Sequence, residues 1–504
     1  MKQLMQSLNI EQREWLLLIS ACLIKLIAGQ SLSGPIFANF MKMSYGLNQR
    51  QLDFSITSMY IGTVLILLSG VFFDRYGARK SVAFSGVFSS LATLFLAIAM
   101  AHPEPLRHSL WLLYILLFLY GHSFNYSYMA AIGCCMSSFQ PSRRGYIMTL
   151  LDTCYNIGPP IVAFIYYVVF ANMHRSVADQ SPVGTMIVLL VFTMAAHTFA
   201  YFFMTPVQSL MDADGLSESI PILSGQQQQS YAETTSSDDD EFDESNATAP
   251  SSAAAEREAN EIRQQRSPDD DFLAQSGEFL KVSCSQSFLP LLLGLGLTIG
   301  ANLSIFLKMT SVTRSLSLTQ YDVYYFWIPC LVSVAWRCLI GPLTDHYLPR
   351  ASQRALVLLA GVFGFGAPSV LMLCTPLAPG ASPLGVTMTA FTLAALVAAT
   401  LYTLAPVIIS QTQQRYLFGR LYSLCVLLGF LVALPLMLQF GALYDSHAQW
   451  TPAANSSAAP TPEEPECFGQ ACYMYGGLAN AACQFVSIAC LAFFAVYLRL
   501  ASSS

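Results

Sequence analysis

The sequence predicts an all-α integral membrane protein, with twelve transmembrane helices in two six-helix bundles and with both termini in the cytosol. Three observations predict this fold class. First, 54% of the 504 residues are hydrophobic and only 11% are charged, whereas a soluble domain carries about a quarter charged residues. Second, twelve apolar stretches are long enough to cross a hydrocarbon core, which takes roughly 20 helical residues each. Third, a short turn motif occurs once in each half of the chain.

The twelve stretches fall into two groups of six. The first stretch is longer than the apolar region of a signal peptide, which spans about 7–15 residues, and it lacks a convincing small-residue cleavage site. We therefore interpret it as a span. The first group lies near 15–41, 54–73, 81–101, 109–138, 146–171 and 182–206, and the second near 287–307, 321–344, 355–378, 383–411, 417–443 and 472–498.

A charged segment separates the two groups. Residues 206–282 contain 17 acidic and 4 basic residues, a net charge of -13, whereas the rest of the chain has 13 acidic and 20 basic residues, a net charge of +7. Such a segment buries too little apolar surface to fold alone. We predict an N-terminal bundle at 1–205, a disordered cytosolic linker at 206–282, and a C-terminal bundle at 283–504 that includes an outer loop at 445–471.

The short loops predict the orientation. With the N-terminus inside, the cytosolic segments carry twelve Lys and Arg residues and the outer segments carry six. Because basic loops stay on the cytosolic side, both termini are expected there. The bases do not cluster on a solvated face, so the expected partner is the lipid bilayer and not a nucleic acid.

A turn motif follows the second and the eighth predicted spans. Its second copy begins 271 residues after the first and keeps Gly341 and Asp345, but lacks the Arg and Gly that come next in the first copy. This spacing indicates two duplicated halves. We expect the Asp to cap the helix after the turn and to pair with bases across the loop. The first copy comprises Gly70, Asp74, Arg75, Gly77, Arg79 and Lys80.

The first copy resembles the loop 2–3 signature of the major facilitator superfamily, and the second resembles its degraded partner in loop 8–9. The resemblance implies two bundles that rock around a central binding site, with a monomer as the functional unit. The loop at Asp74 and Arg75 would stabilise the outward-facing state, and the second copy would form a weaker gate. We expect no cofactor, and no Gly-rich phosphate loop points to ATP.

The last outer loop resembles a narrower group. The C-x-G-x-x-C element at Cys467 and Cys472 is similar to one that precedes the final span in the nodulin-like branch, and segments near Phe418 and 139–145 point the same way. Because an outer loop permits oxidation, these two cysteines either form a disulfide or stay as free thiols. Metal binding is not expected, because no His or further Cys completes a set of four. Asn455 begins an acceptor sequon for glycosylation on the same side.

Ionisable residues within predicted spans are the main candidates for function. A central Lys or Arg costs roughly 2.5–3.5 kcal/mol on insertion, so each one needs a reason. Lys25 lies near mid-membrane in the first span, and Arg337 and Asp152 lie about 12 Å and 10 Å from the cytosolic ends of their helices by the helical rise. We expect Arg337 and Lys25 to bind an anionic group, because the guanidinium can donate two parallel hydrogen bonds to a carboxylate.

The sequence Arg337-x-x-x-Gly341 resembles the helix 8 motif of monocarboxylate porters, in which the matching Arg is a substrate ligand. The alternative is a structural ion pair of Arg337 with Asp152 or Asp345. For proton coupling the candidates are His122, whose imidazole titrates near neutral pH, and Asp152. His122 can equally be a packing residue. Further substrate-binding candidates are Gln30, Asn125 and Tyr402.

These predictions describe a secondary active transporter that moves a small polar solute by alternating access. We favour a proton-coupled carrier of a carboxylate-bearing metabolite in the plasma membrane or an endolysosomal or vacuolar membrane. A carrier of a metal or organic cation stays open, as does a solute-sensing transceptor that signals through the linker. An enzyme is not expected, since the sequence shows neither a nucleophile motif nor a metal-ligand pair on one helix.

Overall fold

The computed structural model describes residues 9–47, 49–166, 182–204, 268–318, 321–374, 382–413, 417–447 and 471–501, and the regular elements in these ranges are helical. The chain divides into two compact units, Met1–Pro206 with Lys281–Ser504, and Val207–Leu280. The helices that correspond to the predicted spans all belong to the first unit.

In the N-terminal half, the second and third spans share one long helix. A kink at Gly77, with φ 77° and ψ 175°, separates them, a conformation that only glycine adopts readily. The turn motif therefore interrupts a helix and forms no extended loop. The long helix is α5 (Leu67–Ala101): its part before Gly77 continues α4 (Gln49–Val64) as the second span, and its part after Gly77 is the third. The other spans are α2 (Ile10–Gly29) with two short 3-10 turns, α7 (Leu110–Ser123) with α8 (Asn125–Ser138), α9 (Arg144–Phe164) and α10 (Val183–Phe203).

The C-terminal half repeats the arrangement with longer, less interrupted helices. Short helices α3 (Ala38–Tyr45), α6 (Glu104–Arg107) and α16 (Met309–Ser315) follow spans in both halves. The six spans are α15 (Leu289–Leu307), α17 (Asp322–Tyr347), α18 (Ala351–Gly361) continued through a π-helical turn into α19 (Ala367–Cys374), α20 (Pro383–Thr412), α21 (Phe418–His447) and α22 (Ala471–Ala501).

Nine helical stretches in the described residues are long and apolar enough to cross a membrane. The stretch Phe54–Ala101, with 48 residues, holds two predicted spans. Helices α7–α8 and α9 correspond to the fourth and fifth spans, which gives the predicted twelve. Large apolar side chains such as Val87, Trp111 and Phe192 are more than half exposed, as expected of a surface covered by lipid.

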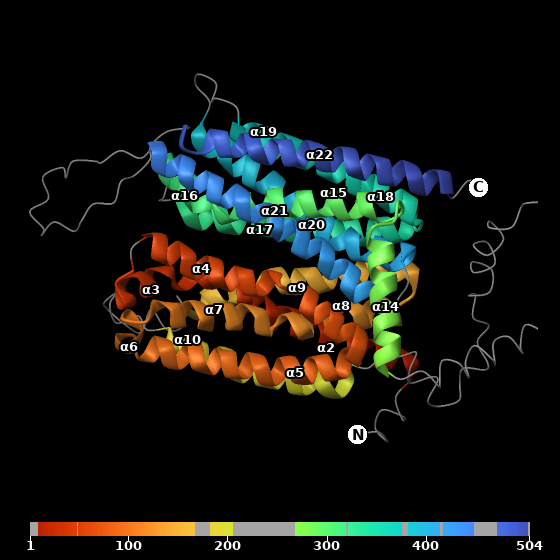
Figure 1. Ribbon diagram of the computed structural model, residues 1–504, viewed down its shortest axis with the longest axis horizontal. Helices are drawn as coiled ribbons and strands as arrows, with labels where there is room; N and C mark the ends of the chain where they lie inside the picture. Colours follow the sequence, from red (N-terminus) through yellow and green to blue (C-terminus); the bar gives the residue numbers. More distant parts are fainter. Residues whose placement is uncertain are drawn as a thin grey trace, which may run out of the picture. The chain divides into compact units, whose positions relative to one another are not determined.

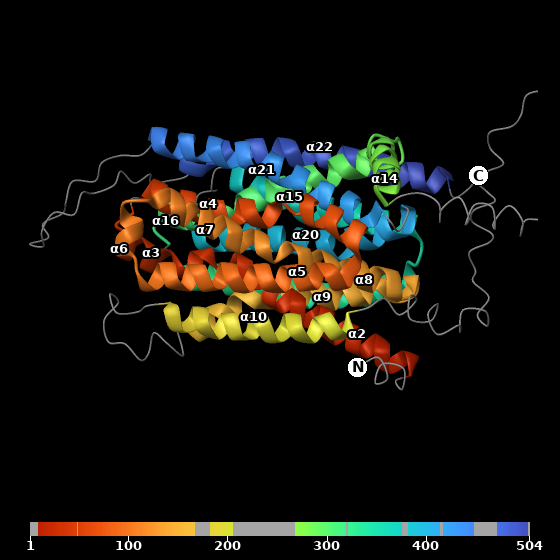
Figure 2. The same cartoon turned by 60° about the horizontal axis from the view of Figure 1, so that its bottom comes forward.

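The two halves lie side by side, and Figure 1 shows the N-terminal helices in red to yellow and the C-terminal helices in green to blue. Helix α9 packs against α17 and α20, and α5 packs against α21. In both views the first turn of α2 and the last turn of α22 lie at the same end of the bundle (Figure 2). We call this the cytosolic end, after the orientation predicted from the loop charges.

The end of the predicted linker is helical. Helix α14 (Pro268–Ser283) begins with Pro and three Asp residues and has Lys281 in its last turn. Proline is favoured at the first helical position, and this order of charges complements the helix dipole. Residues 268–282 of the predicted linker are therefore helical, and the predicted boundary at 282 falls inside α14. The rest of the linker lies outside the described residues.

Candidate functional site

An ion pair joins the first and fifth spans inside the bundle. The Lys25 Nζ atom of α2 lies 3.5 Å from Asp152 Oδ1 of α9, and these side chains are 0% and 3% exposed. The two helices approach closely near this pair: a Cβ atom on Gly29 would lie 2.2 Å from the Tyr155 carbonyl oxygen. Only glycine permits this approach, so the backbone holds two buried opposite charges within contact distance.

Tyrosine rings surround the ammonium group. Lys25 Nζ lies 3.5 Å from the centroid of the Tyr128 ring and 5.5 Å from that of Tyr155. The Tyr128 hydroxyl is 3.4 Å from the hydroxyl of Tyr422 in the opposite half. Aromatic faces stabilise a desolvated cation. Sequence reasoning did not assign these three residues to the site, although Tyr128 ends the polar and aromatic run that begins at His122.

Arg337 on α17 belongs to the same site. Its side chain is buried, Nη1 donates to Ser333 Oγ at 3.2 Å, and Nε has no hydrogen-bond partner among the described residues. The backbone carbonyl of Arg337 accepts a hydrogen bond from Thr149 Oγ1 of α9 at 2.9 Å, which ties the two halves together here. Arg337 interacts electrostatically with Asp152 and with Tyr402.

The structural alternative for Arg337 required an ion pair with Asp152 or Asp345. Asp152 pairs with Lys25 instead, and Asp345 pairs with Arg354. Within the described part of the chain, no carboxylate lies within 4.0 Å of the Arg337 guanidinium. Two buried cations thus share one buried carboxylate, Asp152, which interacts with both.

His122 and Asn125 form a different cluster. His122 Nδ1 is 3.1 Å from the Gly62 carbonyl and Nε2 is 3.2 Å from the Tyr126 hydroxyl. Asn125 Nδ2 donates to the same carbonyl at 3.0 Å. The imidazole stacks on Phe118 with centroids 6.0 Å apart. All these partners belong to the N-terminal half, so the geometry favours the packing role for His122.

Gln30 begins a chain of buried polar groups. Its Nε2 donates to Thr193 Oγ1 at 2.9 Å, while Oε1 has no partner among the described residues. The Thr193 carbonyl accepts from His197 Nδ1 at 2.8 Å, and His197 Nε2 is 3.1 Å from Ser127 Oγ. This chain links the 3-10 turn after α2 to α10 and α8 within the N-terminal half.

The aspartate of the first turn motif caps a helix of the opposite half. Asp74 Oδ1 accepts a hydrogen bond from the Gly419 N–H at 3.1 Å, and Oδ2 accepts from the Arg420 N–H at 2.9 Å. The Arg420 Nε atom is 3.6 Å from Oδ2. We call this contact the first cap. A carboxylate at a helix N-terminus satisfies free N–H groups and opposes the helix dipole.

The second copy makes the equivalent contact in the other direction. Asp345 Oδ1 accepts from the Gly145 N–H at 3.0 Å, and Oδ2 accepts from the Tyr146 N–H at 2.7 Å. Arg354 Nη2 lies 2.7 Å from Oδ1. We call this contact the second cap. Each half therefore caps a helix of the other half at the cytosolic end.

One expectation about the motif is corrected. The aspartates cap α21 and α9, not the helices that follow their own turns. After Gly77 the kinked helix α5 continues without a free start, and α18 begins with Arg350 as its own N-cap residue. The second copy keeps both backbone hydrogen bonds between the halves, while Arg354 pairs with Asp345 within one half. The bases of the first copy lie against rings instead: Arg79 Cζ is 4.5 Å from the Tyr201 centroid, Arg75 Cζ is 5.4 Å and Lys80 Nζ 5.7 Å from that of Tyr76.

The capped glycines escaped sequence reasoning. Gly145 follows Arg144 and Gly419 precedes Arg420, each in the first turn of a helix, and the two glycines are 274 residues apart, close to the 271 residues between Gly70 and Gly341. That second repeat was the available signal. The predicted disulfide depends on Cys467, which, like Asn455, lies outside the described residues. In the described ranges no group of three or more His, Cys, Asp or Glu could hold a metal ion.

The chain belongs to the Major Facilitator Superfamily, whose family model matches residues 19–434. It is a multi-pass membrane transporter of that superfamily and not an enzyme. No curated protein sequence matches the chain significantly.

Solved structures of transporters share the fold. The proton:xylose symporter XylE bound to 6-bromo-6-deoxy-D-glucose has a TM-score of 0.62 at 13% identity, with 95% of each chain covered. A bacterial homologue of the iron transporter ferroportin, in an outward-facing state with soaked iron, has 0.59 at 13% identity, with 97% and 99% covered. The human organic anion transporter MFSD10 (TETRAN) has 0.55 at 12% identity, with 95% and 100% covered. At such identities the likeness concerns the fold alone.

Proposed function

We propose that this transporter carries a small carboxylate-bearing metabolite together with protons by alternating access. Arg337 would anchor the carboxylate, Lys25 would be a second positive contact, and Asp152 would carry the proton. Tyr402 would line the site beside Arg337. The helix 8 resemblance to monocarboxylate porters supports the role of Arg337, and the motifs of the last outer loop support a place in the nodulin-like branch.

The charge of the central site carries this proposal. Lys25 and Arg337 are 0% and 2% exposed, and Asp152, the one carboxylate among the described residues that interacts with both, is also 2% exposed. An uncompensated charge in the membrane interior is costly, so a site with one excess positive charge favours a monoanion over a cation or a neutral solute. The unpartnered Nε of Arg337 leaves a donor for that anion.

Coupling to protons follows from the ion pair. The Oδ2 atom of Asp152 has no hydrogen-bond partner among the described residues, so it is a place for a proton. Protonation of Asp152 would release Lys25 and raise the positive charge that faces the anion. Because coupling is reciprocal, a bound anion would also raise the affinity for the proton. Substrate affinity is then expected to increase as the pH falls.

The two caps support alternating access. Hydrogen bonds between the halves run from Cys330 and Asn156 at the middle of the bundle to Asp74 and Asp345 at the cytosolic end. We infer that the cytosolic gate is closed and that the caps stabilise the outward-facing state. Opening to the cytosol would break both caps together.

The test is uptake into proteoliposomes of labelled monocarboxylates, amino acids and metal ions, with and without an inward proton gradient. For Arg337→Gln we expect carboxylate uptake to fall at least about tenfold, since a hydrogen bond to a charged group contributes about 1.5–3 kcal/mol. For Asp152→Asn we expect uptake that no longer responds to the gradient. The matched control is Arg107→Gln, at an Arg that is half exposed and pairs with Glu104.

Uptake of cations alone, undiminished in Arg337→Gln, would contradict the proposal. It would make Arg337 structural and move the site to Asp152 and His122, as the cation alternative requires. Binding without flux, together with loss of signalling on deletion of 206–282, would favour the transceptor.

A further inference from the structure

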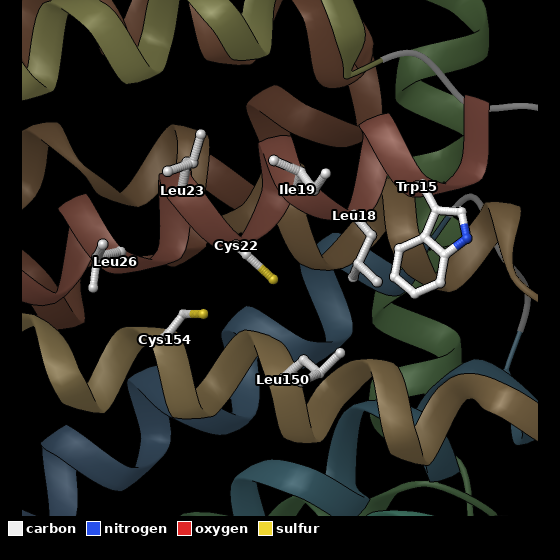
Figure 3. Close-up of a pocket in the computed structure, with 8 residues that line it drawn as sticks. All are labelled: Trp15, Leu18, Ile19, Cys22, Leu23, Leu26, Leu150 and Cys154. Atoms are coloured by element: carbon white, nitrogen blue, oxygen red, sulfur yellow. The ribbon is translucent and has the colours of Figure 1, made fainter. Parts of the chain in front are cut away.

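Two thiols face each other across the contact between the first and fifth spans. Cys22 on α2 and Cys154 on α9 line one cleft of about 280 Å³, and Figure 3 shows both sulfur atoms directed into it. The two thiols also interact electrostatically. The thiols therefore face each other from the two helices that form one cleft.

The cleft opens to the outside of the bundle. Its rim includes Trp15, Ile19 and Leu23, which are 54%, 47% and 36% exposed, and its other lining residues are leucines. In a membrane this apolar rim meets acyl chains. Both thiols are half-buried, whereas Cys134 and Cys135 on α8 are fully buried. A small apolar reagent dissolved in the lipid can thus reach Cys22 and Cys154.

The pair also lies beside the central ion pair. Cys22 is three residues, about one helical turn, before Lys25, and Cys154 is two residues after Asp152. A bond between the sulfurs would join α2 to α9 next to the contact of 3.5 Å between Lys25 and Asp152. The close approach of Gly29 to Tyr155 already holds the same two helices further along.

We propose that Cys22 and Cys154 are a redox-active thiol pair that a hydroperoxide, ROOH, converts into a disulfide between α2 and α9. One sulfur attacks the terminal oxygen, the O–O bond breaks, and the alkoxide leaves with the thiol proton as ROH. The resulting sulfenic acid is attacked by the second thiol: the S–S bond forms, the S–O bond breaks, and water leaves. Two thiols lose two electrons, and ROOH is reduced to ROH and water.

The experiment uses the full chain in liposomes, treated with cumene hydroperoxide, which enters lipid, or with hydrogen peroxide, which stays in water. Free thiols are then blocked with N-ethylmaleimide, and the linked peptides are identified by mass spectrometry before and after dithiothreitol. We expect a Cys22–Cys154 link, with loss of two free thiols per chain, reversed by the reductant. The treatment that gives the faster link identifies the source of the oxidant.

The variants Cys22→Ser and Cys154→Ser are expected to lose the link. Cys338→Ser, at an exposed thiol on α17, is the matched control and is expected to keep it. If both thiols stay open to N-ethylmaleimide after both treatments, or are oxidised singly without a link, the proposal is overturned. The wild-type peptides decide this even where a variant fails to fold.

A second readout is transport. We expect oxidation to lower uptake in the wild type, and dithiothreitol to restore it, because the link restricts separation of Lys25 and Asp152. This part rests on the proposed function. The peptide measurement does not depend on any substrate, so failure of the thiol pair and failure of the proposed function are distinguishable.

Discussion

The first and second caps perform the same task with different partners. In both, one carboxylate accepts two backbone N–H groups at the start of a helix in the opposite half. The first cap adds Arg420 of that opposite half at 3.6 Å. The second adds Arg354, nine residues from Asp345 in the same half, at 2.7 Å.

This difference separates two roles of a basic residue at a gate. Arg420 meets Asp74 across the boundary between the halves, so its pairing depends on the gate being closed. Arg354 meets Asp345 within one half, so its pairing can persist when the gate opens. Only an interaction that differs between two states shifts their equilibrium. Arg420 is therefore expected to affect the equilibrium between the closed and open gate, and Arg354 the stability of the fold.

The largest effect is expected from adding a side chain at the glycine contact beside each cap. A Cβ atom on Gly70 would lie 2.4 Å from the Gly419 carbonyl oxygen, and one on Gly341 would lie 2.6 Å from the Gly145 carbonyl oxygen. We expect Gly70→Val and Gly341→Val to open the cytosolic end by about 3 kcal/mol, a shift of more than a hundredfold, because overpacking forces the backbones apart. Both added Cβ atoms also meet a side-chain oxygen, Ser423 Oγ at 2.4 Å for Gly70 and Thr149 Oγ1 at 1.9 Å for Gly341, so we expect effects of similar size.

Distances between spin labels at Arg143→Cys and Arg350→Cys, two exposed positions on opposite halves, measure this opening once other reactive cysteines are replaced. Gly364→Val is the control, because a Cβ atom there meets nothing within 4 Å. Unchanged label distances in both cap variants would show that the helices tolerate a side chain at the boundary.

An intermediate effect is expected from the arginines. For Arg420→Gln we expect a shift toward the open cytosolic end of about 1.5 kcal/mol, roughly tenfold, since a charge-assisted contact between the halves is lost. For Arg354→Gln we expect a lower melting temperature with little change in label distance. Equal shifts in label distance for the two variants would mean that the second cap also depends on its arginine for closure.

The smallest effect is expected at the kink. Gly77 has φ 77°, and a Cβ atom there would meet nothing within 4 Å, so any penalty is conformational. The equivalent residue of the second copy, Leu348, has φ -133°, which any residue adopts. We expect Gly77→Ala to lower the free energy of unfolding by about 1 kcal/mol. Thermal unfolding in detergent measures it, and Gly364→Ala serves as the control; an unchanged melting temperature would remove the conformational argument.

The sequence by itself determined the spans, the turn motif and the three central charges. Span length follows from local hydropathy against the thickness of the bilayer. Lys25, Asp152 and Arg337 stood out because a charge within an apolar helix is costly wherever that helix faces. None of these inferences requires knowledge of which helices are neighbours.

The tertiary structure alone decided the partners of those residues. The first cap joins residues that are 345 positions apart in the sequence, and the second joins residues that are 200 positions apart. The contact of Lys25 with Asp152 spans 127 positions. The separate cluster of His122 and the tyrosines around Lys25 depend on how each helix is rotated about its axis. Rotation and pairing are set by packing between helices, such as Gly29 against Tyr155, and local sequence patterns carry little of that information.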